Sequence, residues 1–282
     1  MGAGNASNRA DCLDVEMTIK VGRGKDVGYI DIHSHILPNM DDGSRSLRQS
    51  LSMLHIACEE GIELMIATPH NMPGKGCPEA ALVQAAVERL REQVRQENLP
   101  VEILCGTEYY YREEVLELLE AEQGITLGDS DCILVEFDPM VDRIYFRNAL
   151  RDILGTGYRP VVAHVERYGR VMEDTALLHD LKKMGILFQV NALSVTGENG
   201  RQTKKGVRKL LKESLVDFVA TDAHSDGRRA PYMVKCAEIL YRKYGRDYAD
   251  ALLYGNAERL IVSCERTSHS MDERYRFVDG YQ

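Results

Sequence analysis

Short apolar segments alternate with amphipathic segments along most of the chain, and this alternation limits the fold more than any other feature. The apolar segments are residues 28–35, 64–67, 101–105, 132–135, 160–163, 186–190 and 216–220. Helical patterns lie between them, over residues 47–58, 79–97, 113–121, 144–154, 175–184 and 204–213, and two more follow over 232–244 and 247–262. Such alternation predicts right-handed βαβ units and a parallel sheet whose strands are buried on both faces. Seven such units can close into an α/β barrel.

No long insertion or linker interrupts this pattern, so we expect a single domain over residues 29–262. Residues 1–28 lack sustained periodicity and predict a flexible N-terminal extension, and residues 263–282 predict a C-terminal tail. The chain holds 35 Lys and Arg against 44 Asp and Glu, and the net charge of −9 disfavours binding to nucleic acid. We find no apolar run that could cross a bilayer and no signal peptide, and we expect a cytoplasmic protein.

Polar side chains of one kind follow the apolar segments. The first segment ends in His33-Ser34-His35, and residues two apart on a strand point to the same face. In barrels of parallel strands the active site lies at the carboxyl ends of the strands. The later segments end beside further imidazoles and carboxylates, namely His70, Glu108, Glu136, His164, Asp222 and His224. Closing the barrel would bring these side chains together.

Imidazole and carboxylate without thiolate is the ligand set of hydrolytic Zn, Mn, Fe or Mg sites. Five histidines and at least three carboxylates exceed what one ion needs, so we expect two or three ions with bridging carboxylates. Such a cluster lowers the pKa of a bound water and clamps the oxygens of an in-line displacement at phosphorus or an acyl carbon. The expected reaction is hydrolysis.

Arginines near two strand ends are suited to bind a phosphate. Arg167 follows His164, and Arg228 or Arg229 follows His224. A guanidinium group matches two phosphoryl oxygens in a planar fork, which an acyl substrate would not require.

Cysteine chemistry is not expected. Cys236 and Arg242 have the Cys-x5-Arg spacing of cysteine-based tyrosine phosphatases, but the residues between them keep helical order and include no Gly or Ser. A phosphate-wrapping loop cannot form there without breaking a helix. The seven cysteines are scattered without a C-x-x-C pair, which predicts reduced thiols.

Taken together, the motifs resemble the PHP (polymerase and histidinol phosphatase) superfamily, and specifically the bacterial CpsB/CapC-type tyrosine-protein phosphatases. The motifs that carry the resemblance occur in family order at Tyr29–Gly43, Ala67–His70, Gly106–Tyr110, Val135–Phe137, Ala163–Tyr168, Gln189–Asn191 and Thr221–His224. The resemblance implies a distorted seven-stranded (β/α)7 barrel, a relative of the TIM barrel. It also implies a trinuclear site that favours manganese, with Fe, Zn or Mg as alternatives.

By the same resemblance, the metal-site positions of the family fall on His33, His35, Asp42, His70, Glu108, Glu136, His164, Asp222 and His224. The phosphate-contacting arginines of the family fall on Arg167 and Arg228. A metal-bridging hydroxide would attack phosphotyrosine directly, without a phosphoenzyme intermediate. The implied substrate is the Tyr-rich tail of a bacterial tyrosine kinase that controls capsule or exopolysaccharide synthesis.

Departures from the family pattern leave some assignments open. Asn71 stands where the family often has a second His after Thr-Pro-His. Asp41 and Asp42 both fit the carboxylate position, and a shorter loop after His224 lets Arg228 and Arg229 both fit the phosphate position.

Three other functions remain as alternatives. A PHP-type phosphatase could act on a small molecule such as histidinol phosphate or a nucleotide, and a metal-binding adaptor could hold a phosphotyrosine tail without turnover. An amidohydrolase also opens with His-x-His, but that fold usually relies on a carboxylated Lys where this chain has Glu108 and Glu136.

Overall fold

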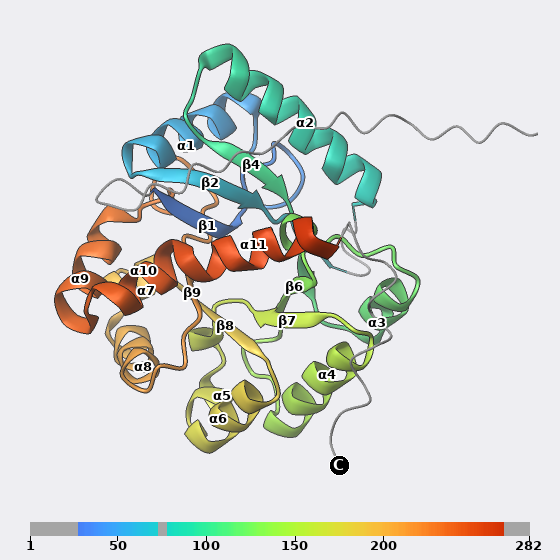
Figure 1. Cartoon of the computed structure of the whole chain (residues 1–282), viewed down its shortest axis with the longest axis vertical. Helices are drawn as coiled ribbons and strands as arrows, with labels where there is room; N and C mark the ends of the chain where they lie inside the picture. Colours follow the sequence, from blue (N-terminus) through green and yellow to red (C-terminus); the bar gives the residue numbers. More distant parts are fainter. Residues whose placement is uncertain (1–27, 73–77, 268–282) are drawn as a thin grey trace, which may run out of the picture.

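The structure, a computed structural model, describes residues 28–72 and 78–267 of the 282-residue chain. Its strands are all parallel and helices surround them (Figure 1). In the described part, one sheet has the order β1 (Tyr29–Ser34), β2 (Ile62–Ala67) and β4 (Glu102–Cys105). The other has the order β3 (His70–Asn71), β5 (Glu108–Tyr110), β6 (Cys132–Glu136), β7 (Arg159–Val162), β8 (Leu187–Asn191) and β9 (Phe218–Ala220).

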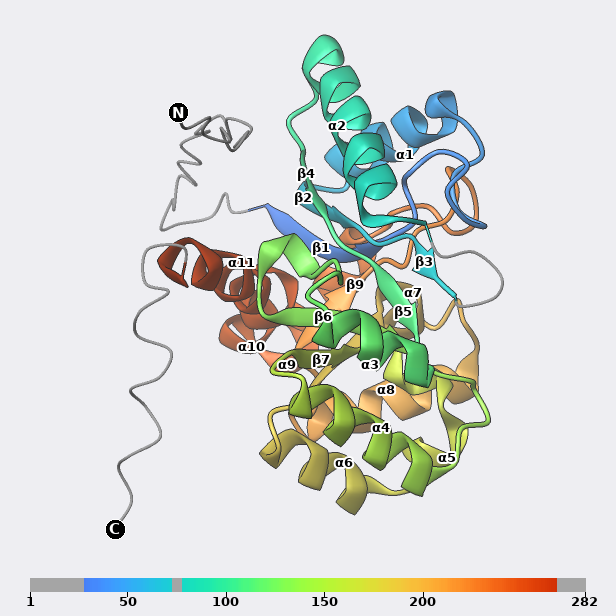
Figure 2. The ribbon, with the colours of Figure 1, turned by 90° about the vertical axis from the view of Figure 1, so that its right-hand side faces the viewer.

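Two short breaks divide what would otherwise be continuous strands. Thr68-Pro69 separates β2 from β3, and Gly106-Thr107 separates β4 from β5 (Figure 2). Pro69 has no N–H to donate to a ladder, and a Cβ atom on Gly106 would lie only 2.7 Å from Cγ2 of Ile66. With each broken pair taken as one strand, the nine described segments form the seven strands that the sequence predicts.

The first and last strands close the ring. A parallel bridge pairs Ser34 with Ala223, and the Asp222 N–H donates to the His33 carbonyl at 2.9 Å. The buried Asp31 carboxylate accepts from the Thr221 N–H at 2.9 Å and from the Thr221 hydroxyl. These contacts hold the carboxyl ends of β1 and β9 side by side. The predicted α/β barrel is confirmed.

The outer helices are α1 (Leu47–Glu59), α2 (Ala80–Glu97), α3 (Glu113–Glu120), α4 (Arg143–Gly155), α5 (Gly169–Met172), α6 (Thr175–Lys183), α7 (Ala192–Thr196), α8 (Arg201–Lys212), α9 (Val234–Tyr244), α10 (Arg246–Asp250) and α11 (Asn256–Thr267). They form because apolar residues recur at helical spacing, as Phe146, Ala149, Leu150 and Ile153 do on the buried face of α4. No described helix is both long and apolar enough to pass through a bilayer.

The helical pattern over residues 247–262 differs from the prediction of one helix. It forms α10, a π-helical turn over Ala251–Gly255, and α11, and α11 continues to Thr267, past the residue where the tail was expected to begin. Gly255 lies in the π turn, and glycine is a poor former of a regular helix. The N-terminal extension over residues 1–27 and the tail after residue 267 lie outside the described residues.

The barrel interior is filled by apolar side chains at one end and by polar side chains at the other. The inner cluster includes Ile32 of β1, Leu134 of β6 and Leu127, which precedes β6. Leu260 and Ile261 of α11 join this cluster, and α11 lies across the strands in Figure 1. The apolar core therefore occupies the amino-terminal part of the barrel and leaves the carboxyl ends of the strands for the polar residues.

Candidate metal centre

The nine ligand-type side chains predicted from the sequence gather at the carboxyl ends of the strands. Seven of them line one hollow of about 250 Å³, namely Asp42, His70, Glu108, Glu136, His164, Asp222 and His224. The other two, His33 and His35, are buried, and their Nε2 atoms each lie 3.2 Å from Oε2 of Glu108. The end residues of strands that are far apart in the sequence thus lie together in one cluster.

The centre of the cluster is the carboxylate of Glu108, which is fully buried. Its Oε2 atom lies 3.1 Å from Nδ1 of His70, and its Oε1 atom lies 3.0 Å from Nε2 of His164. Despite these short distances, Oε2 of Glu108 and Nδ1 of His70 have no hydrogen-bond partner among the described residues. Buried polar atoms without partners are costly, and these two lie 3.1 Å apart, a separation at which both can bind one cation.

Hydrogen bonds at Nδ1 orient three of the imidazole rings. Nδ1 of His35 lies 2.6 Å from Oδ2 of Asp41, and Nδ1 of His33 lies 3.2 Å from Oε1 of Gln189. Nδ1 of His224 lies 2.9 Å from the carbonyl oxygen of Asp222. With Nδ1 donating, each ring presents a lone pair on Nε2, which is the usual arrangement of a metal-ligating histidine. The residues present therefore fit a metal ion.

The side chains form three overlapping groups in which the ligand atoms lie within 4.8 Å of one another. The groups are His35, Asp42, His70 and His224; His33, His35 and Glu108; and His70, Glu108 and Glu136. Because His35, His70 and Glu108 each belong to two groups, neighbouring ions would share ligands. This is the arrangement expected for two or three ions, and their number stays a prediction.

Asp41 and Asp42, which the sequence does not distinguish, have different surroundings. Asp41 is tied to protein groups, since its Oδ2 atom also accepts from the His70 N–H at 3.0 Å. The side chain of Asp42 is 70% exposed, and its Oδ1 atom lies 3.4 Å from Nε2 of His70 and 3.5 Å from Nε2 of His224. The geometry thus favours Asp42 as a ligand and Asp41 as the residue that orients His35.

The two arginines that line the hollow are Arg167 and Arg229. Nη2 of Arg167 lies 2.6 Å from Oδ2 of Asp222, and Nη2 of Arg229 lies 2.9 Å from Oδ1 of the same residue. Arg228, which the sequence prediction placed at the phosphate, is exposed and does not line the hollow. The loop turns back so that the His224 N–H donates to the carbonyl of Arg229 at 2.9 Å, which directs Arg229 toward the site.

The neighbouring imidazoles and carboxylates shift one another's pKa values. Burial alone would lower the pKa of His35, but the hydrogen bond with Asp41 and the nearby carboxylate of Glu108 outweigh burial and raise the pKa to about 10. Burial would raise the pKa of Glu108, but His33 and the other nearby imidazoles hold that pKa well below its usual range. The carboxylates are therefore ionised and require nearby positive charge, which metal ions supply when they displace protons from their ligands.

His164 and Asp222 have left-handed backbone conformations, with φ values of 33° and 53°. Residues other than glycine rarely adopt such angles, and strained conformations of this kind cluster at functional sites. The His164 N–H donates to Oε1 of Gln189 at 2.7 Å, which helps to hold its backbone in place.

Gln189 and Asn191 belong to the site although the sequence prediction gave them no role. Nε2 of Gln189 donates to Oδ1 of Asn191 at 2.8 Å, and Nδ2 of Asn191 donates to Oδ2 of Asp222 at 2.7 Å. Both are buried on β8. Two polar residues at alternate positions of an apolar strand repeat the spacing of His33 and His35, and that signal could have identified them.

The family model described as "Capsular polysaccharide synthesis, CpsB/CapC" matches residues 29–262. Tyrosine-protein phosphatase YwqE of Bacillus subtilis (strain 168) is 35% identical over 234 residues, which cover 82% of this chain and 91% of YwqE. Tyrosine-protein phosphatase CpsB of Streptococcus agalactiae serotype V is 30% identical over 237 residues, which cover 82% of this chain and 98% of CpsB.

The fold agrees with the sequence comparison. Among solved structures, the chain is similar to one described as crystal structures of YwqE from Bacillus subtilis and CpsB from Streptococcus pneumoniae, unique metal-dependent tyrosine phosphatases. The TM-score is 0.78 at 34% identity, and the match covers 83% of this chain and 94% of the other.

Proposed function

Because the chain belongs to the CpsB/CapC family, we propose that its substrate is the Tyr-rich, phosphorylated tail of a bacterial tyrosine kinase that controls capsule or exopolysaccharide synthesis. The chain itself is a metal-dependent tyrosine-protein phosphatase, as its similarity to YwqE and CpsB indicates. The phosphoprotein substrate, the metal and the role of each residue are what we propose here.

The observation that carries this function is the placement of the ligand cluster and two guanidinium groups around one hollow. A cluster of imidazole and carboxylate ligands suits the hydrolysis of either phosphorus or acyl centres. Arg167 and Arg229 narrow this choice, because their planar donors match phosphoryl oxygens. We propose manganese for the site because the family resemblance implies it; the nitrogen and oxygen ligands themselves also suit iron, zinc or magnesium.

The residues of the chain position the substrate. When bound, the ions supply Lewis-acid charge and lower the pKa of coordinated water toward neutrality. Arg167 and Arg229, both anchored on Asp222, hold the phosphoryl oxygens from the side. Phe137 and Pro139 line the same hollow and offer apolar surface to the phenyl ring of phosphotyrosine.

Exposed apolar residues beside the hollow favour a protein substrate over a small molecule. Met140 follows Pro139 and is 64% exposed, and Ile144 at the start of α4 is 71% exposed. Exposed apolar residues in the segment that follows the hollow-lining Pro139 suit a surface that contacts another protein. A small phosphate ester would not reach them.

The substrate assignment is tested with the manganese-loaded protein and four substrates at equal concentration. These are a phosphotyrosine peptide from a kinase tail, the same peptide with phosphoserine, histidinol phosphate and p-nitrophenyl phosphate. We expect kcat/KM for the phosphotyrosine peptide to exceed that for phosphoserine and histidinol phosphate at least about tenfold, because the apolar walls match the phenyl ring. Faster hydrolysis of histidinol phosphate would support a small-molecule phosphatase instead. Bound metal without turnover of any substrate would support an adaptor.

Arg228 and Arg229 form a matched pair for testing the phosphate contact. We expect Arg229→Ala to lower kcat/KM for p-nitrophenyl phosphate about a hundredfold, since one charged donor to the phosphoryl group is lost. Arg228→Ala removes a similar charge from an exposed position and is expected to change kcat/KM less than about twofold. Steady-state kinetics of both variants at equal metal content gives the answer. Equal losses in the two variants, or a larger loss for Arg228→Ala, would contradict the assignment.

A further inference from the structure

Helix α8 is strongly basic in a chain whose net charge is −9. It carries six cationic residues and no acidic one, namely Arg201, Lys204, Lys205, Arg208, Lys209 and Lys212. Val207, Leu210 and Leu211 are buried, so the cationic side chains occupy the outer part of the helix. Like charges four residues apart destabilise a helix, so this pattern does not serve the stability of α8 itself.

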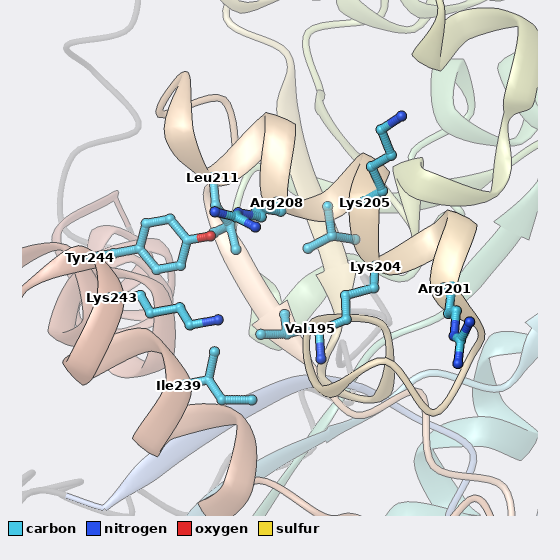
Figure 3. A pocket seen from close by; sticks show the side chains of 10 residues that line it. Val195, Arg201, Lys204, Lys205, Arg208, Leu211, Ile239, Lys243 and Tyr244 are labelled. Atoms are coloured by element: carbon cyan, nitrogen blue, oxygen red, sulfur yellow. The ribbon is translucent and has the colours of Figure 1, made fainter.

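A hollow of about 250 Å³ lies between α8 and α9 (Figure 3). Val195, Leu211 and Ile239 provide its apolar surface, and Tyr244 and Lys243 of α9 face Arg208 of α8 across it. Arg201, Lys204 and Lys205 also line it. In the described part of the chain, no acidic side chain lines this hollow.

A second hollow of about 530 Å³ continues the first along the same helices. Arg208, Lys243 and Tyr244 line both hollows, and Lys212 lines the second one only. We call the two hollows together the α8–α9 groove. A third hollow beside α8 differs, because the acidic residues Glu166 and Glu173 are among its lining residues.

Most cations of the α8–α9 groove have no acidic partner. Among the described residues, no carboxylate lies within 4.0 Å of the charged nitrogens of Arg201, Lys205, Arg208, Lys212 or Lys243. Lysines elsewhere are paired, as Lys182 is with Asp217 at 2.5 Å and Lys235 is with Glu198 at 3.0 Å. The unpaired charges of the groove are therefore free to bind an anion.

We propose that the α8–α9 groove binds a second phosphotyrosine of the substrate protein while the first one occupies the metal centre. The proposal rests on the proposed function, which makes a phosphotyrosine protein the substrate. Val195, Leu211 and Ile239 suit a phenyl ring, and the guanidinium, ammonium and phenol groups around them suit a phosphate that carries nearly two negative charges.

The groove is connected to the catalytic face through neighbouring elements. Helix α8 packs against the 3₁₀ turn η2 (Val165–Arg167), which carries Arg167 of the metal centre. Helix α7 lies between α8 and Asn191, the residue that donates to Asp222. A substrate segment long enough to run from the metal centre along α8 would contact both places, and binding at one would then raise the effective concentration at the other.

An anionic membrane surface suits the groove less well. The large apolar residues of α8 are buried, and among the described residues no exposed large apolar side chain belongs to this helix. A helix that lies on a membrane inserts an exposed apolar face between the lipids. The negative net charge of the chain also opposes approach to anionic lipid.

The test uses the double variant Arg208→Glu/Lys243→Glu in the full chain, because these two residues line both hollows. The control is Arg89→Glu/Arg95→Glu, which makes the same change of charge at exposed positions of α2. Substrates are p-nitrophenyl phosphate, a peptide with one phosphotyrosine, and peptides with two phosphotyrosines at several spacings. Fluorescence anisotropy of a labelled peptide with two non-hydrolysable phosphotyrosine analogues, on the metal-loaded protein, measures binding without turnover.

We expect the α8–α9 variant to raise KM for the best doubly phosphorylated peptide by about tenfold or more, with kcat unchanged, and to weaken its binding equally. KM for p-nitrophenyl phosphate and the singly phosphorylated peptide should stay within about twofold, and the α2 control should match the parent protein. These last values also verify that the variant is folded.

Unchanged KM and binding of the doubly phosphorylated peptide in the α8–α9 variant would overturn the docking proposal while leaving the phosphatase function intact. A parent protein that binds this peptide through the groove but hydrolyses no phosphotyrosine would instead refute the function and keep the docking site. Loss of sedimentation with phosphatidylglycerol vesicles in the variant, with peptide KM unchanged, would replace the proposal by a membrane contact.

Discussion

Substitution of Glu108 by glutamine is expected to lower kcat/KM for p-nitrophenyl phosphate by about a thousandfold and to remove most of the bound metal. Glu108 is fully buried, and its two oxygens lie 3.0–3.2 Å from nitrogens of four histidines. The glutamine amide has the same shape as the carboxylate but carries no negative charge. Its nitrogen also has no free lone pair with which to bind a metal ion. Metal-assisted hydrolysis that depends on several kcal/mol of charge stabilisation would lose about three powers of ten.

The matched control for this substitution is Glu102→Gln. Glu102 is the first residue of β4, and Glu108 is the first residue of β5, which continues the same strand. The side chain of Glu102 is exposed and does not line the hollow. Metal content by elemental analysis, kinetics, and circular dichroism on both variants separate a site defect from unfolding. Glu108→Gln protein that keeps its metal and stays within tenfold of the parent would exclude a central role for this carboxylate.

Chelation is expected to abolish phosphatase activity, and added Mn²⁺ is expected to restore it. The buried Oε2 atom of Glu108 and Nδ1 atom of His70 have no hydrogen-bond partner among the described residues, which is the state that a cation would relieve. Without ions, the arginines still bind phosphate but no water is activated. The measurement is phosphate release after EDTA treatment and desalting, followed by titration with Mn²⁺, Fe²⁺, Zn²⁺ or Mg²⁺.

Thiol alkylation is the paired control for the chelation experiment and is expected to leave activity unchanged. Burial raises the pKa of the Cys105 thiol to about 11 and that of Cys132 to about 12, so neither is reactive near neutral pH. Cys236, whose spacing to Arg242 imitates a cysteine-based phosphatase, is buried within α9. Activity that survives chelation but is lost on alkylation would contradict the metal mechanism.

The gathering of the candidate ligands could be predicted because it depends on strand ends, and strand ends are visible in the sequence. His33, Glu136 and His164 each come at or next to the end of an apolar run. In a parallel barrel these ends meet on one face whatever the details of the loops. The same logic places Asp222 and His224 at the site.

Loop geometry and side-chain networks could not be predicted in the same way. The choice between Arg228 and Arg229 depends on a turn in which the carbonyl of Arg229 accepts the His224 N–H, and neighbouring arginines give no sign of this. Asp41 and Asp42 differ only in the direction that one loop takes. The break at Gly106 is likewise set by tertiary packing, because a Cβ atom there would contact Ile66, rather than by local periodicity.

The closure of the ring by β1 and β9 has a consequence for biosynthesis. His33 and His35 emerge from the ribosome first among the ligands, whereas Asp222 and His224 emerge last. Translation therefore leaves the early histidines without Asp222 and His224 until almost the whole domain has been synthesised. A product that stops before β9 lacks Asp222, His224 and the strand that closes the ring, so we expect activity only from chains that extend past His224.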